Sequence, residues 1–217
     1  MMKSEIIKRI FSSIILIPIT LYFIIKGSFF FTLFILILFI VAAYEWNGMN
    51  KKKKYKVSGF IFLLVSMYLT VLLRGNTDYD LYIFLVTILI CVSTDIGGYI
   101  FGNLFKGPKI NKILSPNKTY SGSIGGYFLS ITFVYIFSEN SYLVSNNIES
   151  SFGKYEIILI LIISTISQIG DFIISFFKRK SKIKNTGSII PGHGGLLDRI
   201  DGMIFAFPFA FLILKIL

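Results

Sequence analysis

The chain has 217 residues, of which 54% are hydrophobic and 15% are charged, and its mean hydropathy is +0.76. A water-soluble domain of this length could not cover so much apolar surface, so the composition excludes that class and predicts an integral membrane protein. The net charge of +11 does not indicate nucleic-acid binding, because the basic residues cluster between apolar segments.

Hydropathy predicts seven apolar segments, each close to the roughly 20 residues that cross a bilayer core as a helix. They are expected at residues 10–25, 29–46, 57–73, 81–101, 121–137, 155–177 and 197–217. The first resembles a signal peptide, but no cleavage site follows, so we expect a retained helix with a kink at Pro18. The predicted fold class is therefore all-α, a polytopic membrane protein with about seven transmembrane helices.

Basic residues are distributed unevenly between the two sides of these segments. The N-terminus and the loops after the second, fourth and sixth segments, which include the run 51–54, hold 18 of the 22 Lys and Arg residues. By the positive-inside rule these loops lie in the cytoplasm. We therefore expect any polar site built from them to face the cytoplasm.

The stretch from Asp171 to Asp201 joins the last two apolar segments. Asp171 lies well inside an apolar helix, which costs about 2.5–3.5 kcal/mol unless the acid is paired or hydrated, and intramembrane acids are functional by default. Ser175 and Lys178 follow at i+4 and i+7 and share its helical face. A purely structural Asp–Lys pair between helices is the alternative interpretation.

A basic run and a glycine-rich turn follow. The run alone could set topology or bind anionic headgroups; it comprises Lys178, Arg179, Lys180, Lys182 and Lys184. Glycines let a backbone approach phosphate oxygens closely, and four of them stand nearby with a proline: Gly187, Pro191, Gly192, Gly194 and Gly195. His193 is the only histidine, so a His/Cys zinc cluster is excluded. We expect His193 to donate a hydrogen bond to a phosphate or to carry a proton.

Asp198 and Asp201 stand three apart at the start of the last segment and share one side of a helix, with Arg199 turned away from them. Carboxylates beside a basic, glycine-rich loop suit Mg²⁺, which one or two carboxylates and substrate phosphates commonly hold. In the alternative interpretation Asp198 caps the helix and Asp201 pairs with Arg199 or a loop lysine.

A second group of polar residues surrounds the fourth segment. Asp95 is intramembrane, and Gly98 and Gly102 form a small-residue stripe suited to close helix contact. The loop beyond it carries a compact set of hydroxyls, a lysine and a glycine over residues 115–122. Alone this loop is a weak phosphate-binding signal, because turns have the same composition.

Residues 175–201 together match a longer pattern: S-x-x-K-R, then K-D-x-G, then P-G-H-G-G-x-x-D-R-x-D. This pattern resembles that of the phosphatidate cytidylyltransferase (CDP-diacylglycerol synthase) family. Residues 94–102 resemble the family's D-x-G-A-Y-x-x-G element, and residues 115–119 resemble its S-P-x-K-T element. The chain departs from the pattern at Asn185, an amide where the family has a carboxylate, and we expect fewer N-terminal helices than in other members.

The resemblance implies that CTP and phosphatidate react to CDP-diacylglycerol and pyrophosphate for phospholipid synthesis. It implies Mg²⁺ or another hard divalent cation as cofactor, with room for a second cation, held by Asp171 and Asp198. Catalytic roles are implied for Asp171, Lys178, Arg179, His193, Asp198, Arg199 and Asp201. Substrate-binding roles are implied for Asp95, Ser115, Lys118, Thr119, Ser175, Lys184, Gly192, Gly194 and Gly195.

We therefore expect one domain over residues 1–217, with 1–80 as scaffold and 81–217 carrying the motifs, in a bacterial inner membrane with its active site toward the cytoplasm. The expected partners are CTP, phosphatidate and the bilayer, and no nucleic acid; a homodimer is left open. Two other functions remain. A CTP-dependent polyprenol or lipid kinase would transfer the γ-phosphate, and a transporter would use Asp95 and Asp171 as a coupling pair but leave the Pro-Gly-His-Gly-Gly turn unexplained.

Overall fold

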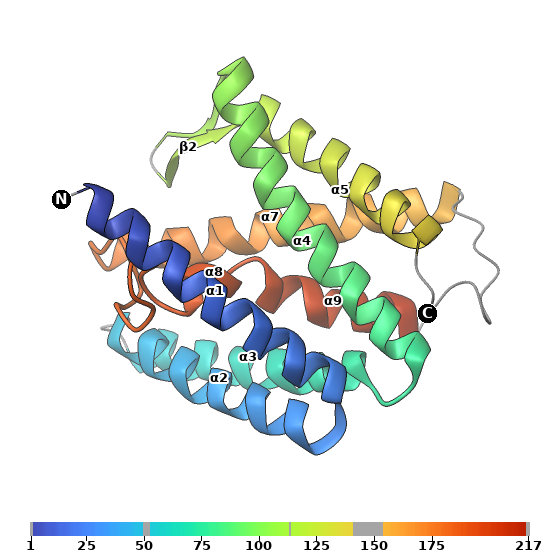
Figure 1. The fold of residues 1–217 in the computed structure, drawn as a ribbon. Helices are drawn as coiled ribbons and strands as arrows, with labels where there is room; N and C mark the ends of the chain where they lie inside the picture. Colours follow the sequence, from blue (N-terminus) through green and yellow to red (C-terminus); the bar gives the residue numbers. More distant parts are fainter. Residues whose placement is uncertain (1, 50–52, 113, 141–153, 216–217) are drawn as a thin grey trace.

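A computed structural model describes residues 2–49, 53–112, 114–140 and 154–215 of the chain, so the beginning of the basic run 51–54 lies outside the described residues. The described part is built of helices and one short β-hairpin (Figure 1). In chain order the elements are α1 (Met2–Lys26), α2 (Ser28–Met49), α3 (Lys53–Arg74), α4 (Asp78–Phe105), β1 (Lys109–Asn111), β2 (Ser115–Thr119), α5 (Tyr120–Asn140), α7 (Lys154–Lys180), α8 (Leu197–Ile200) and α9 (Met203–Lys215).

Within the described residues, six helices are long and apolar enough to cross a membrane, which confirms the prediction of a polytopic helical membrane protein. These spans are Ile7–Lys26, Ser28–Met49, Tyr55–Arg74, Asp78–Phe105, Tyr120–Asn140 and Tyr155–Lys180. The pure all-α prediction misses the hairpin, in which β1 pairs antiparallel with β2. The hairpin is closed at its base by a hydrogen bond from the Tyr120 N–H to the Pro108 carbonyl.

The prediction of one continuous seventh helix is wrong, because the last apolar segment is broken into α8 and the 13-residue α9. The break falls at Asp201 and Gly202, where the Gly202 N–H donates to Asp201 Oδ1 (3.0 Å). Gly202 also packs so closely on α7 that a Cβ there would lie 2.4 Å from Ser167 Oγ. A side chain that competes for backbone N–H groups, followed by a glycine, interrupts a helix readily.

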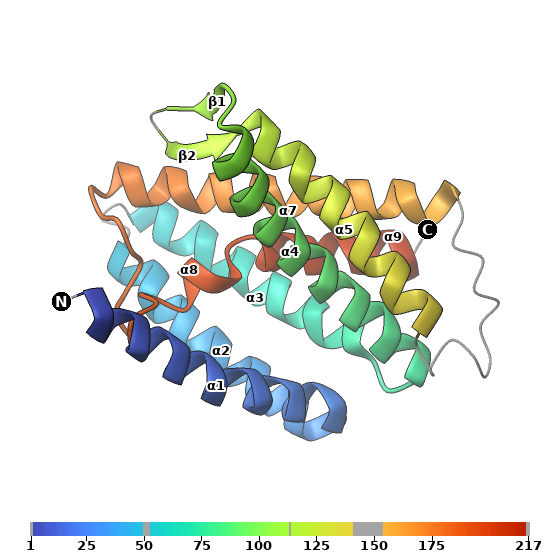
Figure 2. The same ribbon diagram turned by 45° about the horizontal axis from the view of Figure 1, so that its top comes forward.

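The helices place the sequence motifs at one end of the bundle. In Figures 1 and 2 the N-terminus, the hairpin, α8 and the C-terminal end of α7 gather at one end, and the α3–α4 turn and the C-terminus lie at the other. Lys215 forms an ion pair with Asp80, which holds the end of α9 beside the start of α4. The broken segment therefore runs from the motif end of the molecule to the opposite end.

Close glycine contacts join α4 to α5. A Cβ at Gly97 would lie 2.4 Å from the Gly125 carbonyl oxygen, and one at Gly122 would lie 2.7 Å from the Gly98 carbonyl oxygen. This confirms the predicted small-residue stripe at Gly98 and Gly102 and extends it to Gly97. The α4–α5 pair carries the hairpin at its motif end (Figure 2).

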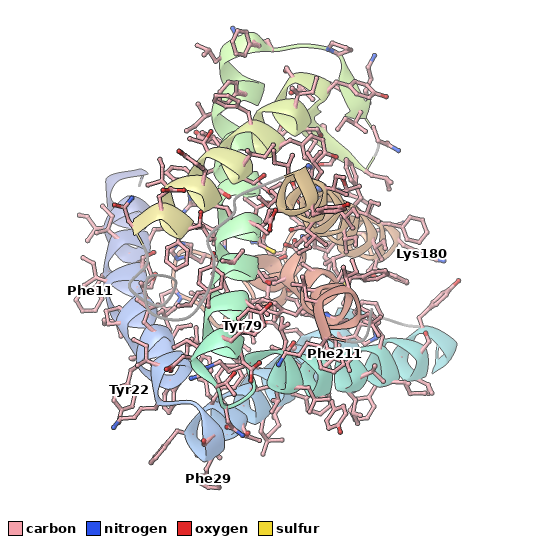
Figure 3. The ribbon with its side chains drawn as sticks, turned by 90° about the vertical axis from the view of Figure 1, so that its right-hand side faces the viewer. Phe11, Tyr22, Phe29, Tyr79, Lys180 and Phe211 are labelled. Carbon is pink, nitrogen blue, oxygen red and sulfur yellow. The ribbon has the colours of Figure 1, made fainter. Side chains whose placement is uncertain are left out.

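Large apolar side chains cover the outside of the bundle. Figure 3 shows Phe11, Tyr22 and Phe29 pointing outward from α1 and α2, and their exposed fractions are 66%, 52% and 72%. Such residues on the outer face of long helices suit contact with lipid rather than water. The buried polar residues of the molecule therefore stand out as candidates for function.

Candidate active site

A pocket of about 300 Å³ lies between α4, β2, α5 and α7. Its lining includes Asp95 from α4 and Asp171 from α7, the two intramembrane acids, together with Lys118 from β2. Lys118 forms an ion pair with Asp171. The fold thus brings the two separate sequence motifs together at one carboxylate.

Two further predicted residues line the same pocket through the hairpin. Ser115 begins β2, and Thr119 ends it. The Thr119 hydroxyl accepts a hydrogen bond from the Gly122 N–H (3.1 Å) and contacts Ser121 Oγ (3.0 Å). Thr119 therefore also stabilises the N-terminus of α5, because its oxygen satisfies a backbone donor in the first turn.

Asp171 connects the pocket to the broken segment. Its Oδ1 accepts a hydrogen bond from Ser175 Oγ (3.3 Å), which is the i+4 contact expected from the sequence. Its carboxyl group and that of Asp201 are close enough to influence each other electrostatically. Neighbouring carboxylates repel each other when both are ionised. Lys118 beside Asp171 and Lys178 beside Asp201 offset this repulsion.

Lys178 lies between the two aspartates of the last segment. Its Nζ is 3.0 Å from Asp198 Oδ1 and 3.8 Å from Asp201 Oδ2. The other oxygen of Asp198, Oδ2, accepts from the Thr186 N–H (2.8 Å) and the Gly195 N–H (3.0 Å). Asp198 therefore neutralises a nearly buried lysine and holds the loop between α7 and α8 (residues 181–196, the motif loop) at the same time. It does not cap the helix, because α8 begins without a side-chain cap.

The glycine turn is closed by its own backbone. Gly192 (φ 77°) and Gly194 (φ 93°) adopt left-handed conformations that other residues rarely tolerate. The N–H groups of His193 and Gly194 donate to the Ile190 carbonyl, and the Ile190 N–H donates to the Gly194 carbonyl. With the Gly195 N–H bound to Asp198, these N–H groups are engaged inside the loop and are not free to bind an anion.

His193 lies between the turn and α1. Its Nδ1 is 2.9 Å from Ser12 Oγ, and Arg9 Nε donates to the Gly192 carbonyl (2.8 Å). Burial lowers the pKa of His193 from its ordinary value of 6.5, and the cations Arg199 and Arg9 lower it further. His193 is therefore neutral at pH 7, which favours a hydrogen-bonding role over a permanent cationic one.

The remaining predicted cations lie at the surface of the site. Arg199 is exposed and donates to the His193 carbonyl (2.8 Å). Arg179 is exposed and donates to the carbonyls of Leu114 and Ile183 (both 3.4 Å). Lys184 is exposed on the loop. These three groups can reach an anion arriving from solvent, and Lys118 and Lys178 lie deeper.

Glu45 of α2 was missed by the sequence interpretation, although an acid in an apolar run was the signal that identified Asp95 and Asp171. It is 2% exposed, and its carboxylate accepts from Thr186 Oγ1, the Leu196 N–H and the Leu197 N–H, each at 2.9 Å. A buried carboxylate is stable when its oxygens are satisfied in this way. Glu45 thereby fixes both ends of the motif loop from a helix that was expected to be scaffold.

Further pocket residues also escaped the sequence interpretation, because an isolated amide, phenol or hydroxyl in an apolar helix or a turn has no distinctive pattern. These are Ser123 and Gln168. Thr94, Tyr99 and Asn117 also line the pocket and lie within the motif elements 94–102 and 115–119, although no role was assigned to them.

The carboxylates allow a test of the implied cation. In the described part of the chain, no three His, Cys, Asp or Glu side chains converge into a metal cluster. Mg²⁺ does not need such a cluster, since one or two carboxylates plus substrate phosphates suffice. Asp171 and Asp201 are neighbours and fit this requirement once Lys118 releases the Asp171 oxygen that it contacts. Asp198 would likewise have to release Lys178 from its Oδ1.

The chain matches known proteins over nearly its whole length. The model of the cytidylyltransferase family matches residues 7–74 and 57–217. The phosphatidate cytidylyltransferase of Rickettsia typhi is 35% identical over 213 residues, covering 96% of this chain and 92% of the relative, and that of Rickettsia bellii is 33% identical over 97% and 91%. The phosphatidate cytidylyltransferase of Brucella melitensis is 38% identical over 62% of this chain and 47% of its own length. Relatives of nearly the same length thus exist, and this chain belongs to the cytidylyltransferase family.

Proposed function

We propose that this protein transfers the cytidylyl group of CTP to phosphatidate and releases pyrophosphate. One observation carries the assignment: Lys118 of the hairpin and Asp171 of α7 form an ion pair inside one pocket, although they belong to separate motifs. Pairing of this kind places cations and carboxylates together at membrane depth. A reaction between an anionic nucleotide and an anionic lipid requires such a site.

In the proposed reaction an oxygen of the phosphatidate phosphate forms a bond to the α-phosphorus of CTP, and the bond to the β-phosphate breaks. The phosphate is already anionic at neutral pH, so no strong general base is needed, and catalysis rests on positioning and charge neutralisation. Lys118 and Lys178 would neutralise the reacting phosphates, and Arg179, Lys184 and Arg199 would attract CTP at the rim.

A hard divalent cation, when bound, would draw electron density from the phosphate oxygens and lower the repulsion between the substrates. We propose that Asp171 and Asp201 hold it. Asp198 would bind it only if Lys178 moved from Oδ1, and its present contacts position Lys178 and the loop. His193 would orient the turn or donate to a phosphate, with Ser12 fixing its ring.

The proposed orientation has the motif end in the cytoplasm of a bacterial inner membrane. The charge asymmetry supports it, because 18 of the 22 Lys and Arg residues belong to that side. CTP would then enter from the cytoplasm and phosphatidate from the inner leaflet.

Purified protein in detergent with CTP, Mg²⁺ and phosphatidate tests the assignment. We expect CDP-diacylglycerol and pyrophosphate, and we expect Asp198→Asn to lower kcat by about 100-fold or more, because Lys178 and the loop lose their anchor. The exposed Glu139→Gln at the other end of α5 serves as control. Formation of CDP and a newly phosphorylated lipid would instead identify a kinase, and full activity of Asp198→Asn would refute the role of Asp198.

A further inference from the structure

Gln168 of α7 presents the one buried side-chain nitrogen without a hydrogen-bond partner in the described part of the chain. This residue lines the pocket together with Asp95 and Asp171. A buried donor that lacks a partner costs about 1–3 kcal/mol, so such groups are rare and call for an explanation. A ligand that accepts hydrogen bonds in the pocket supplies one.

The neighbours of Gln168 show that this part of the molecule otherwise satisfies its polar groups. Ser164 Oγ, one turn before it, lies 2.8 Å from Thr94 Oγ1 of α4. Thr165 Oγ1 lies 2.9 Å from the Tyr127 hydroxyl of α5. Each hydroxyl joins α7 to a neighbouring helix, whereas the Gln168 amide nitrogen does not. Its location in the pocket wall therefore points to a ligand rather than to helix packing.

Depth indicates which part of a substrate the amide would meet. Gln168 precedes Asp171 by three residues, and α7 ends at Lys180 on the motif side. A helix rises about 1.5 Å per residue, so Gln168 lies about 4.5 Å farther from that end than Asp171 does. Two charged groups suit phosphates: Lys118, which pairs with Asp171, and Lys178, which lies closer to the motif end of α7. A neutral donor below them suits a neutral acceptor.

We propose that the Gln168 carboxamide donates a hydrogen bond to an ester carbonyl of the lipid substrate, close to its glycerol backbone. Phosphatidate carries its ester carbonyls a few bonds from the phosphate, and an ester carbonyl accepts hydrogen bonds but donates none. When the phosphate lies beside Asp171 and Lys118, the glycerol esters extend toward the membrane interior, past Gln168. This inference rests on the proposed function and makes Gln168 a specificity-determining residue for the lipid.

A comparison of two lipids and two proteins tests the inference. The lipids are diacyl phosphatidate and its dialkyl ether analogue, which lacks the carbonyl oxygens, and the proteins are the wild type and Gln168→Leu. We expect the wild type to prefer the diacyl lipid by about five- to tenfold in kcat/KM, the value of one hydrogen bond, and the variant to lose the preference. The KM for CTP is expected to stay the same.

Stability controls separate recognition from folding. Gln168→Leu removes an unsatisfied polar group, so the lipid-free variant should melt at the same or a higher temperature. Thr165→Val removes a partnered hydroxyl on the same helix and should lower the Tm, whereas Ile169→Leu on the outer face, where Ile169 is 51% exposed, should change neither Tm nor kinetics.

Several outcomes would overturn the inference: a wild type without ester preference, a variant that keeps it, an equal loss on both lipids, or a raised KM for CTP. A raised KM for CTP would indicate that Gln168 contacts the nucleotide instead of the lipid. If no CDP-lipid forms with the wild type, the proposed function fails. The inference is then tested by the rise in Tm that each lipid causes without CTP. In the wild type the rise should be larger with diacyl phosphatidate than with the ether analogue, and in Gln168→Leu the two rises should be equal.

Discussion

At the scale of single residues, His193 gives a direct measurement. It is the only histidine of the chain, so its ring signals in an NMR titration are unambiguous. Burial and the nearby cations Arg199 and Arg9 lower its pKa, and we expect a midpoint below the ordinary 6.5. Arg9→Gln removes one cation and should raise the midpoint toward 6.5.

The effect of Arg9 can be separated from a general change of fold. Lys8→Gln removes a cation from the same helix, and its charge is not among those that lower the pKa of His193. It should leave the midpoint unchanged. A midpoint at or above 6.5 in the wild type would contradict the neutral state inferred for pH 7.

Glu45 gives a second prediction at this scale. In Glu45→Gln an amide NH₂ replaces one carboxylate oxygen and faces groups that themselves donate, namely Thr186 Oγ1 and the N–H groups of Leu196 and Leu197. We expect a loss of about 1–3 kcal/mol in the stability of the loop. Trypsin should then cut faster at the exposed Lys182 and Lys184, and kcat/KM should fall.

Glu139→Gln is the matched control for this change, because Glu139 is exposed at the distant end of α5. Its proteolysis and activity should equal those of the wild type. Unchanged cleavage at Lys182 and Lys184 in Glu45→Gln would show that the loop is held by other contacts.

At the scale of elements, the close packing of α4 on α5 determines the width of the pocket. Gly97→Ala would place a methyl group 2.4 Å from the Gly125 carbonyl, so the helices must separate. We expect a destabilisation of about 1–3 kcal/mol and a matching loss of activity, because Asp95 lies two residues away on the same helix. The melting temperature in detergent measures the first effect.

Gly48→Ala offers the comparison, since a Cβ at Gly48 meets no atom within 4 Å. It should be neutral or slightly stabilising, as expected for an exchange that reduces the freedom of the unfolded chain. Equal melting temperatures for Gly97→Ala and Gly48→Ala would mean that α4 and α5 are not in tight contact.

The sequence predicted these elements unevenly. Hydropathy located six helices, and glycine spacing located the stripe on α4, because both signals are local in the sequence. It merged α8 and α9, since the interruption depends on the contact of Gly202 with Ser167, which is tertiary. It missed the hairpin, because residues 115–122 have the composition of a turn. Asp171, Asp198 and Lys118 were recognisable from motif spacing. The role of Glu45 shows only in its contacts with residues distant in the sequence, and that of Gln168 only in the lack of a partner for its amide nitrogen.

At the scale of the whole molecule, the ion pair between Lys215 and Asp80 predicts that the chain crosses the membrane a seventh time through α8 and α9. In a Cys91→Ser background, a membrane-impermeant maleimide added outside intact spheroplasts should label Asn76→Cys and a C-terminal cysteine. It should label Ser188→Cys only after lysis. Asn76 and Ser188 are both exposed, so a difference in labelling between them reports the side of the membrane on which each lies.

An even number of crossings would reverse one of these results: the C-terminal cysteine would react only after lysis, like Ser188→Cys. The Asp80→Asn variant supplies a second readout. It breaks the pair with Lys215 and should lower the melting temperature without changing the KM for either substrate. Asp80 lies in the first turn of α4, and the α3–α4 turn is far from the motif end (Figure 1).

The contacts of Glu45 have a consequence for how the protein is made. Its hydrogen-bond partners Thr186 and Leu197 lie 141 and 152 residues later in the chain. During synthesis α2 therefore enters the membrane long before the groups that satisfy its carboxylate exist. We therefore expect that residues 1–80 do not mature as a separate unit, and a fragment that begins at residue 81 lacks the acid that organises its loop. A piece that assembles alone should include both α2 and the last segment, and production as two separate halves should yield material that the cell degrades.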